Sequence, residues 1–529
     1  MAEAEPNSEP TRSPQPEPPH PRIRWWPLWL IAGATVATIT VVWLAQRLNH
    51  QERNLRSLAT LVCAMALAWL WCLAFSRLRW RTRLVICGSV VALGLLAGTT
   101  LRIRGVTGDL LPVLEWRWQG NPPPPAGAVV KTSSALPSAT VAEASYPQFL
   151  GPNRNGTVNA MKLARDWTQK PPRIIWRHSV GAAWSGFAVT GPYALTQEQR
   201  GSDESVTCCD LATGRQIWSA VEPSHYNTVI AGEGPRATPT IVGQRVYAMG
   251  ATGHLTCLDL ATGKRLWSHD VLTECQSRQP EWGVACSPLV WKDLVIVSSG
   301  GQQNNSLVAY QTGDGALAWA GGDDDAGYSS PVAASLLGVE QVLIFNGGNV
   351  AGHDRLTGKV LWRYRWPRGH PHVASPLVVS PSRIVVSSGY GTGSELVELH
   401  HDPGAEWSAT RVWKSNRLKA KFTDLVVREG FIYGLDDGIL ACLDLATGEQ
   451  KWKEGRYGHG QVILVSDVLL ISAETGDVVL VEATPAEHRE LARFNVFQRK
   501  TWNPPALAGR FLLMRNDAEA ACLELSLAP

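Results

Sequence analysis

Several motifs that assign a chemistry directly are missing from this chain of 529 residues. It has no glycine-rich phosphate loop, no Gly-x-Ser-x-Gly elbow and no His-Glu-x-x-His sequence. The usual sequence signs of nucleotide binding, serine hydrolysis and zinc peptidase activity are therefore absent. The formal net charge is only +3, too small to indicate nucleic-acid binding through a basic surface. We expect no nucleic-acid partner.

Cysteine is present without the pattern of a disulfide framework. Three of the 10 cysteines fall in apolar N-terminal stretches and seven lie further along. Four of those seven occupy one strand position of a repeated unit, where they are expected to pack as small apolar groups: Cys208, Cys257, Cys442 and Cys522. The sequence therefore predicts free thiols rather than a disulfide framework, even outside the cytoplasm.

The N-terminal region contains three long apolar stretches after a polar tail. Residues 1–24 are rich in Pro, Glu and Ser and are predicted to be disordered. Residues 25–104 hold apolar stretches at about 27–45, 58–75 and 84–101, each long enough to cross a bilayer. The first lacks a small-residue cleavage site and a lipobox cysteine, which favours three permanent transmembrane helices over a signal peptide. Buried helices of a soluble domain are the alternative, but nothing nearby could cover them.

Arginines set the expected orientation. Seven lie in the tail and in the loop after the second stretch: Arg12, Arg22, Arg24, Arg77, Arg79, Arg81 and Arg83. Five lie on the other side: Arg47, Arg53, Arg56, Arg102 and Arg104. The excess places the N-terminus in the cytoplasm and all that follows the third span outside it. Residues 105–145 then begin with a Leu- and Trp-rich segment on the outer membrane surface and continue as a Pro-, Ala- and Ser-rich linker.

Residues 146–529 consist of short strand-like runs separated by Gly, Asp, Asn and Pro. This texture over such a length predicts an all-β domain too large for a single sandwich. The clearest unit is Leu258–Trp267. Its Asp259 is expected to cap the turn that it opens, Gly263 to supply a positive φ, and Trp267 to fill the gap between neighbouring sheets.

Copies of this unit recur at intervals of roughly 40–50 residues, as in a β-propeller. The recurring residues are Asp210, Gly214, Trp218, Asp259, Gly263, Trp267, Trp319, Asp354, Gly358, Trp362, Asp444, Gly448 and Trp452. The last unit, Cys522–Leu525, stops after a third strand, and Arg173–Trp176 offers the missing fourth. Their pairing would close the ring and remove its open edges. We predict eight four-stranded blades, or seven if the unit at Leu480 is not independent.

The repeated pattern Cys-Leu-Asp-Leu-Ala-Thr-Gly-Lys-x-Leu-Trp resembles the pyrroloquinoline quinone (PQQ) repeat of quinoprotein alcohol dehydrogenase-like β-propellers. That superfamily includes PQQ-dependent alcohol dehydrogenases and BamB-like outer-membrane assembly proteins. Residues 146–156 are also similar to the start of the propeller in bacterial membrane-anchored members. The resemblance implies the fold, and a bacterial inner-membrane protein with its propeller on the periplasmic side. Because the repeat is structural, it does not imply an activity.

In the dehydrogenases, PQQ is accompanied by a calcium or lanthanide ion, an Asp general base and a vicinal disulfide. Cys208-Cys209 is the one adjacent pair here, but it falls in a strand whose successive residues face opposite ways, so packing is expected. Asp323–Asp325 is the acidic cluster of note and is interpreted as a solvated loop rather than a calcium site. We predict no catalytic residue and no metal site. PQQ with calcium is left open as a cofactor, although no set of metal ligands in the sequence supports it.

The start of each innermost strand faces the channel of a propeller. One polar or aromatic residue per blade precedes that strand: Trp184, Arg236, Trp282, Tyr328, His372, Lys421, His459 and Trp502. Such a ring predicts a cationic, aromatic funnel for a protein partner, a peptide or a small anionic or carbohydrate-like ligand. The alternative is that the aromatic rings plug the channel. Together these features favour a membrane-anchored, extracytoplasmic binding scaffold that is not an enzyme; the alternative is a divergent PQQ-dependent dehydrogenase of alcohols or sugars.

Overall fold

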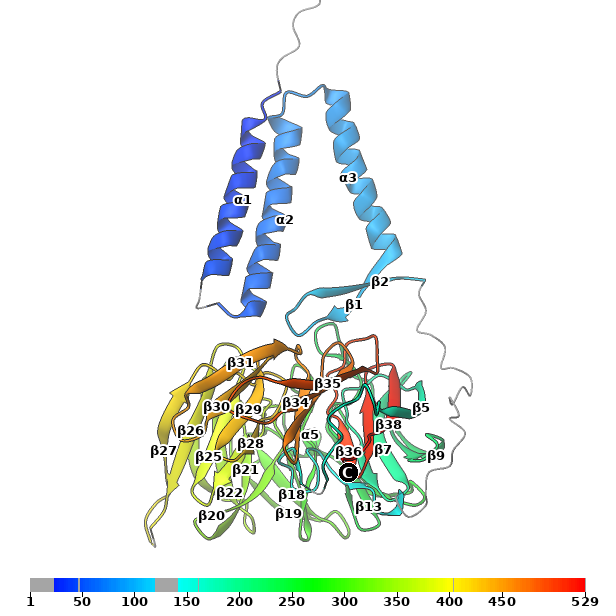
Figure 1. The fold of residues 1–529 in the computed structure, drawn as a ribbon, viewed down its shortest axis with the longest axis vertical. Coiled ribbons are helices and arrows are strands. Elements are labelled where there is room, and N and C mark those ends of the chain that lie inside the picture. The colour runs from blue at the N-terminus through cyan, green and yellow to red at the C-terminus, as the bar shows by residue number, and fades with distance from the viewer. Residues whose placement is uncertain (1–22, 46–47, 119–140, 160, 403, 529) are drawn as a thin grey trace, which may run out of the picture. The chain divides into compact units, whose positions relative to one another are not determined.

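The computed structural model describes residues 23–45, 48–118, 141–159, 161–402 and 404–528 (Figure 1). The predicted tail up to residue 22, Arg47 and the predicted linker from 119 to 140 lie outside these residues. The chain divides into two compact units. The first contains the N-terminal helices, and the second contains residues 49–51 and everything from Ile103 onward.

The first unit is built from α1 (Trp26–Leu44), α2 (His50–Ala74) and α3 (Trp80–Thr100). These three predicted helices are confirmed, and each is long and apolar enough to cross a membrane. Most of their apolar side chains are exposed, with few buried exceptions such as Trp71 and Cys87. A helix satisfies its own backbone hydrogen bonds, so apolar side chains around its whole surface suit a lipid surrounding. The helices therefore fit a membrane anchor.

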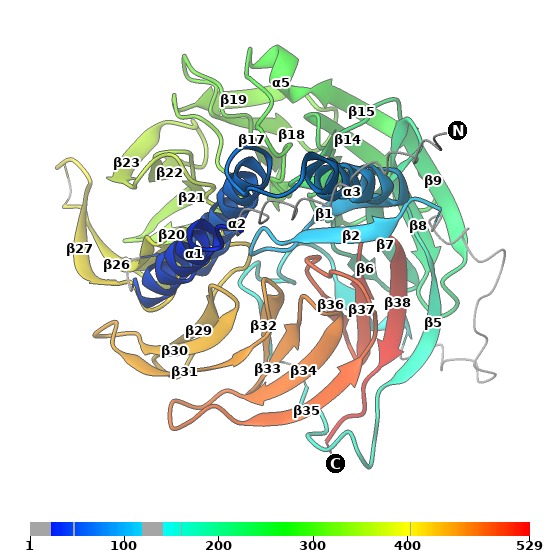
Figure 2. The ribbon, with the colours of Figure 1, turned by 90° about the horizontal axis from the view of Figure 1, so that it is seen from above.

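The second unit is an eight-bladed β-propeller, as predicted, and Figure 2 shows its sheets arranged in a ring. Blades one to four contain β6 (Ala188–Thr190), β7 (Tyr193–Arg200), β8 (Asp203–Asp210), β9 (Gln216–Glu222); β12 (Thr240–Val242), β13 (Arg245–Met249), β14 (His254–Asp259), β15 (Arg265–Asp270); β16 (Leu289–Trp291), β17 (Leu294–Ser298), β18 (Leu307–Gln311), β19 (Leu317–Gly321); β20 (Val332–Leu336), β21 (Val339–Phe345), β22 (Asn349–Asp354) and β23 (Val360–Arg365).

Blades five to eight contain β24 (Leu377–Ser380), β25 (Arg383–Ser388), β26 (Gly393–His400), β27 (Ser408–Ser415); β28 (Val426–Arg428), β29 (Phe431–Asp436), β30 (Ile439–Asp444), β31 (Gln450–Arg456); β32 (Gln461–Val465), β33 (Val468–Ser472), β34 (Asp477–Glu482), β35 (Glu490–Asn495); β36 (Ala506–Ala508), β37 (Phe511–Arg515), β38 (Glu519–Glu524) and β5 (Arg173–Ser179). Within each blade, neighbouring strands pair antiparallel.

Shorter elements complete the second unit. They are β1 (Leu101–Val106), whose strand begins in the first unit, β2 (Pro112–Trp116), β3 (Ser145–Tyr146), β4 (Thr157–Val158), β10 (Asn227–Thr228), β11 (Gly232–Glu233) and the short helix α5 (Val271–Glu274). β1 and β2 form a hairpin, where the sequence indicates only an apolar surface segment.

The ring closes as predicted, because β5 pairs with β38. Cys522 lies opposite Trp176 and Leu523 opposite Ile174, so the last blade takes its outer strand from the start of the domain. This pairing satisfies backbone groups that would otherwise form two open edges. The seven-bladed alternative is excluded, since β32–β35 form a blade of their own.

The repeated tryptophans join neighbouring blades. The Trp218 indole donates a hydrogen bond to the Leu260 carbonyl of the next blade at 2.9 Å, and its ring lies against Gly263. The same indole–carbonyl bond links the pairs Trp176–Leu211, Trp319–Arg355, Trp413–Leu445 and Trp452–Thr484. Trp362 differs, because it donates to Gln341 of its own blade.

The predicted turn chemistry is present at each full copy of the repeat. In the second blade, Asp259 Oδ1 accepts from the Thr262 amide at 2.9 Å and from the Thr262 hydroxyl at 2.6 Å. Gly263 follows at φ 71°, a left-handed conformation that glycine adopts without steric cost. The turn is thereby fixed in the shape that receives the tryptophan of the preceding blade.

Candidate ligand-binding site

The innermost strands begin with small polar residues that link the blades around the axis. The Gly186 amide donates to Thr238 Oγ1 at 3.1 Å, the Thr238 amide to Ser287 Oγ at 3.0 Å and the Ser287 amide to Ser330 Oγ at 3.0 Å. All of these side chains are nearly inaccessible to solvent. Since a buried amide needs a partner, the hydroxyls fix the spacing of the first four blades at the axis.

The sixth blade places a carboxylate at this position. Asp424 Oδ1 accepts from the Ser375 amide at 2.6 Å, and its side chain is 5% exposed. Burial raises the pKa of Asp424 to about 6, although the amide of Ser375 and the charge of Arg154 oppose the increase. Asp424 lines the axial cavity, defined here as the space of about 280 Å³ at the centre of the ring.

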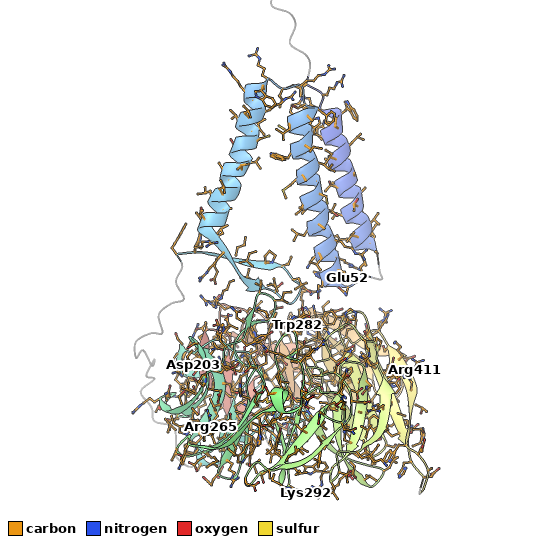
Figure 3. All side chains as sticks on the ribbon, turned by 180° about the vertical axis from the view of Figure 1, so that it is seen from behind. Glu52, Asp203, Arg265, Trp282, Lys292 and Arg411 are labelled. Atoms are coloured by element: carbon orange, nitrogen blue, oxygen red, sulfur yellow. The ribbon has the colours of Figure 1, made fainter. Side chains whose placement is uncertain are left out.

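Aromatic side chains form most of the wall of the axial cavity. Trp184 and Trp502 lie with ring centroids 5.0 Å apart, and Phe422 lies 5.2 Å from Trp502. Across the cavity, Trp282 stacks on Tyr328 at 5.4 Å. Figure 3 shows that Trp282 lies at the opposite end of the propeller from Lys292. Such flat faces with few polar groups are typical of sites for ring-shaped or planar ligands.

The cations of the cavity are bound to main-chain carbonyls. Arg236 donates to the Trp282 carbonyl at 2.9 Å and to the Gly232 carbonyl at 2.8 Å. Its guanidinium also lies 4.2 Å from the centre of the Tyr226 ring. Burial lowers the pKa of Arg236 to about 10 and also lowers the pKa of Lys421. Main-chain carbonyls of the protein therefore already accept part of the hydrogen bonds that these cations can donate.

Six of the eight residues predicted for the funnel line the cavity: Trp184, Arg236, Trp282, Tyr328, Lys421 and Trp502. The structure places the other two beside its wall. His372 stacks on Phe345 at 4.3 Å and is bonded to the Asn346 carbonyl. The His459 ring lies 5.4 Å from Phe422. Ligand binding by these six residues stays a prediction.

A segment before the first blade also lines the cavity and was not expected there. Phe149 contributes to the lining, and the buried Arg154 donates to the carbonyls of Ser287, Pro288 and Pro331. β3 pairs with the first blade and β4 with the seventh, so this segment runs across the ring. Phe149 therefore belongs to the candidate site, and Arg154 supports the strands that form its wall.

The second unexpected contributor is the turn of the β1–β2 hairpin. Val106, Thr107, Gly108 and Leu110 line the cavity beside Lys421 and Trp502. The apolar residues of this segment predicted a position at the membrane surface, and the contact with residues more than 300 positions later has no local signal in the sequence.

The residues at the axis do not fit PQQ with a calcium ion. Such an ion needs several oxygen ligands that converge, and within the described residues no group of three His, Cys, Asp or Glu side chains could hold a metal. Asp323 pairs with Arg363, and Asp325 pairs with Arg368 at 3.2 Å. The cysteines of the pair Cys208-Cys209 are free and buried in β8, and burial raises the pKa of both thiols.

The blade architecture and the tryptophan contacts define a propeller of the PQQ-repeat class. The sequence model of the family described as outer membrane protein assembly factor BamB matches residues 173–454, more than half of the chain. The chain belongs to this family. A search of the curated proteins finds no match.

Three solved structures illustrate what this chain is similar to. BamB from Moraxella catarrhalis is 15% identical, with a TM-score of 0.48 over 67% of this chain and 99% of that chain. A quinohemoprotein alcohol dehydrogenase from Comamonas testosteroni is 13% identical, with a TM-score of 0.51 over 74% and 83%. The dehydrogenase ADHIIG from Pseudomonas putida HK5 is 12% identical, with a TM-score of 0.52 over 76% and 83%. At these identities the likeness to the two dehydrogenases shows the fold alone.

Proposed function

We propose that this protein is a membrane-anchored binding scaffold, with its propeller on the extracytoplasmic side, and that it holds a ligand in the axial cavity without catalysis. The observation that carries the proposal is the aromatic wall formed by Trp184, Trp282, Tyr328 and Trp502 around the lining carboxylate of Asp424. The faces of such rings bind carbohydrate rings and peptide side chains by stacking and exclusion of water.

Ala285 offers a direct test, because it lies in the wall four residues before its innermost strand, as Trp184 and Tyr328 do in their own blades. Ala285→Trp should fill the cavity without disturbing the blade core. The full chain is purified in mild detergent, and the small molecules or peptides that it retains are identified by mass spectrometry. We expect the wild-type chain to retain a compound, and the amount retained by Ala285→Trp to be at least tenfold lower.

Leu317→Trp is the matched control, since Leu317 is exposed on an outer strand, and this variant should retain the compound. Equal retention by the wild-type chain and Ala285→Trp, or no retention by either, would overturn the proposal. An absorbance of bound quinone, or dye-linked oxidation of an alcohol or sugar after PQQ and calcium are added, would favour a divergent quinoprotein dehydrogenase instead.

A further inference from the structure

The turn of the β1–β2 hairpin lies in the rim of the axial cavity. The Leu110 amide donates to the Thr107 carbonyl at 2.9 Å, which defines a β-turn, and the Leu111 amide donates to Thr107 Oγ1 at 3.1 Å. Leu110 has φ 58°, a left-handed conformation that costs energy for a side chain with a Cβ. The docked turn is therefore held in a conformation that it would not favour alone.

Charged side chains of the propeller bind the main chain of this turn. Lys421 Nζ donates to the Gly108 carbonyl at 2.6 Å, and Glu474 Oε1 accepts from the Gly108 amide at 2.8 Å. Lys500 Nζ donates to the Val106 carbonyl at 2.9 Å. Because these bonds reach backbone groups, they select the shape of a turn rather than a long stretch of sequence.

Glu474 is fixed for this contact by its neighbours. Its Oε1 also accepts from the Trp502 indole at 2.9 Å, and its Oε2 accepts from the His459 amide at 2.9 Å. Both lysines lie against aromatic rings, with Lys500 Nζ 3.9 Å from the centre of the Trp502 ring and Lys421 Nζ 5.0 Å from that of Tyr390. A preformed donor and acceptor pair of this kind loses little freedom when it binds.

The rim selects the residue type at two positions of the turn. A Cβ on Gly108 would overlap three atoms of the His459 side chain, two of them in its ring, so glycine alone fits there. The next residue, Asp109, accepts from His459 Nε2 at 3.1 Å through Oδ1. The rim therefore selects Gly-Asp within a β-turn.

We propose that the rim formed by Lys421, His459, Glu474 and Lys500 is a recognition site for Gly-Asp β-turns, that the chain's own turn is its resident occupant, and that a turn of the same chemistry on a partner protein replaces it. Emptying the rim would remove one hydrogen-bond partner from each of Lys421, Glu474 and Lys500, which favours an occupied site. The strain at Leu110 and the main-chain character of the bonds make the resident turn replaceable. The proposal does not depend on a ligand in the axial cavity.

The test uses the full chain in detergent and a fluorescent synthetic peptide of residues 104–115, cyclised so that its turn forms. Gly108→Ala should displace the resident turn, because the new Cβ overlaps His459. We expect this variant to bind the peptide at least tenfold more tightly than the wild-type chain does, as measured by fluorescence anisotropy. Adding Glu474→Gln to Gly108→Ala should weaken peptide binding at least tenfold.

Gly105→Ala is the matched control in the same hairpin, since a Cβ there meets nothing closer than 3.8 Å. It should bind the peptide as weakly as the wild-type chain. Circular dichroism and thermal unfolding establish that each variant retains the propeller. No binding to folded Gly108→Ala, equal binding to the wild-type chain, or unchanged binding of a peptide that itself carries Gly108→Ala would each overturn the proposal. None of these outcomes measures ligand retention in the axial cavity, which is tested with Ala285→Trp in a chain whose hairpin is unchanged, so the two proposals fail separately.

Discussion

Asp424 departs from the hydrogen-bond pattern that other blades repeat at the axis. Three other blades use the hydroxyls of Thr238, Ser287 and Ser330 to accept an amide from the preceding blade. Asp424 makes the same bond with a buried carboxylate. A buried charge is costly unless it is paired. The positive charge of Arg154 favours the ionised form of Asp424, but the Arg154 guanidinium is itself bonded to main-chain carbonyls.

Asp424→Ser should keep the amide bond and remove the charge. The pKa of Asp424 is about 6 in the folded chain against an ordinary value of 3.8. The folded state thus holds a proton that the unfolded state releases, and its contribution to stability is lost as pH rises from about 4 to 6. We expect the unfolding free energy of Asp424→Ser relative to wild type to increase over this range, by roughly 2–3 kcal/mol at most.

Thermal unfolding between pH 4 and 8, followed by tryptophan fluorescence, measures this difference. Asp325→Ser is the control, because Asp325 is exposed and pairs with Arg368 at the surface, where such pairs contribute about 0–1 kcal/mol. If Asp424→Ser is less stable than wild type by the same amount at every pH, the carboxylate has a structural role that a hydroxyl does not replace.

The contact between a turn glycine and the tryptophan of the preceding blade is the packing feature that recurs most often between blades. Each full repeat supplies a turn glycine, and the preceding blade supplies a tryptophan that lies on it. A Cβ on Gly263 would come within 2.5 Å of the Trp218 ring, whereas one on Gly243 of the same blade would meet nothing within 4 Å. Both glycines have positive φ, at 71° and 59°.

Gly263→Ala and Gly243→Ala therefore share the backbone cost of alanine at positive φ, about 1–2 kcal/mol. Only Gly263→Ala also displaces a tryptophan. We expect its unfolding free energy to fall by a further amount of about 1–3 kcal/mol, the usual range for overpacking. Denaturant unfolding of the two variants measures the difference, and equal values would mean that the tryptophan contact does not contribute to stability.

Local chemistry explains which elements the sequence predicts. The turn formed by Asp259 and Gly263 and the alternation of β14 are determined within ten residues, so blades could be placed and counted. The pairing of β5 with β38 follows from a missing strand at the end of the count. The hairpin turn at Gly108 and the segment around Arg154 could not be placed, because their partners are far along the chain and their residues are equally suited to a surface. His372 and His459 are predicted to line the cavity but lie beside its wall. The residue that faces the axis depends on where each innermost strand starts, and a sequence pattern locates that start only to within a few residues.

At the scale of the whole molecule, the arginine bias predicts the side of the membrane on which the propeller lies. The thiols make this measurable. All described cysteines except Cys63 of α2 are buried, so a new surface cysteine in the propeller should dominate labelling. Ser202→Cys, at an exposed loop, should react with a membrane-impermeant maleimide in intact cells.

Arg79→Cys, in the loop between α2 and α3, should react only after the cells are permeabilised. Electrophoretic mobility shifts report both reactions. Labelling of Arg79→Cys but not Ser202→Cys in intact cells would reverse the proposed orientation.

The pairing of β5 with β38 also sets an order of events during synthesis. β5 is made before any complete blade, yet its partner is among the last strands to emerge. An unpaired strand with several apolar residues is prone to wrong pairing until its partner strand has been synthesised. Each newly made copy therefore passes through a period, as long as the translation of the remaining blades, in which the domain is an open arc. A chain that ends before Glu519 would lack β38 and would remain in that state permanently.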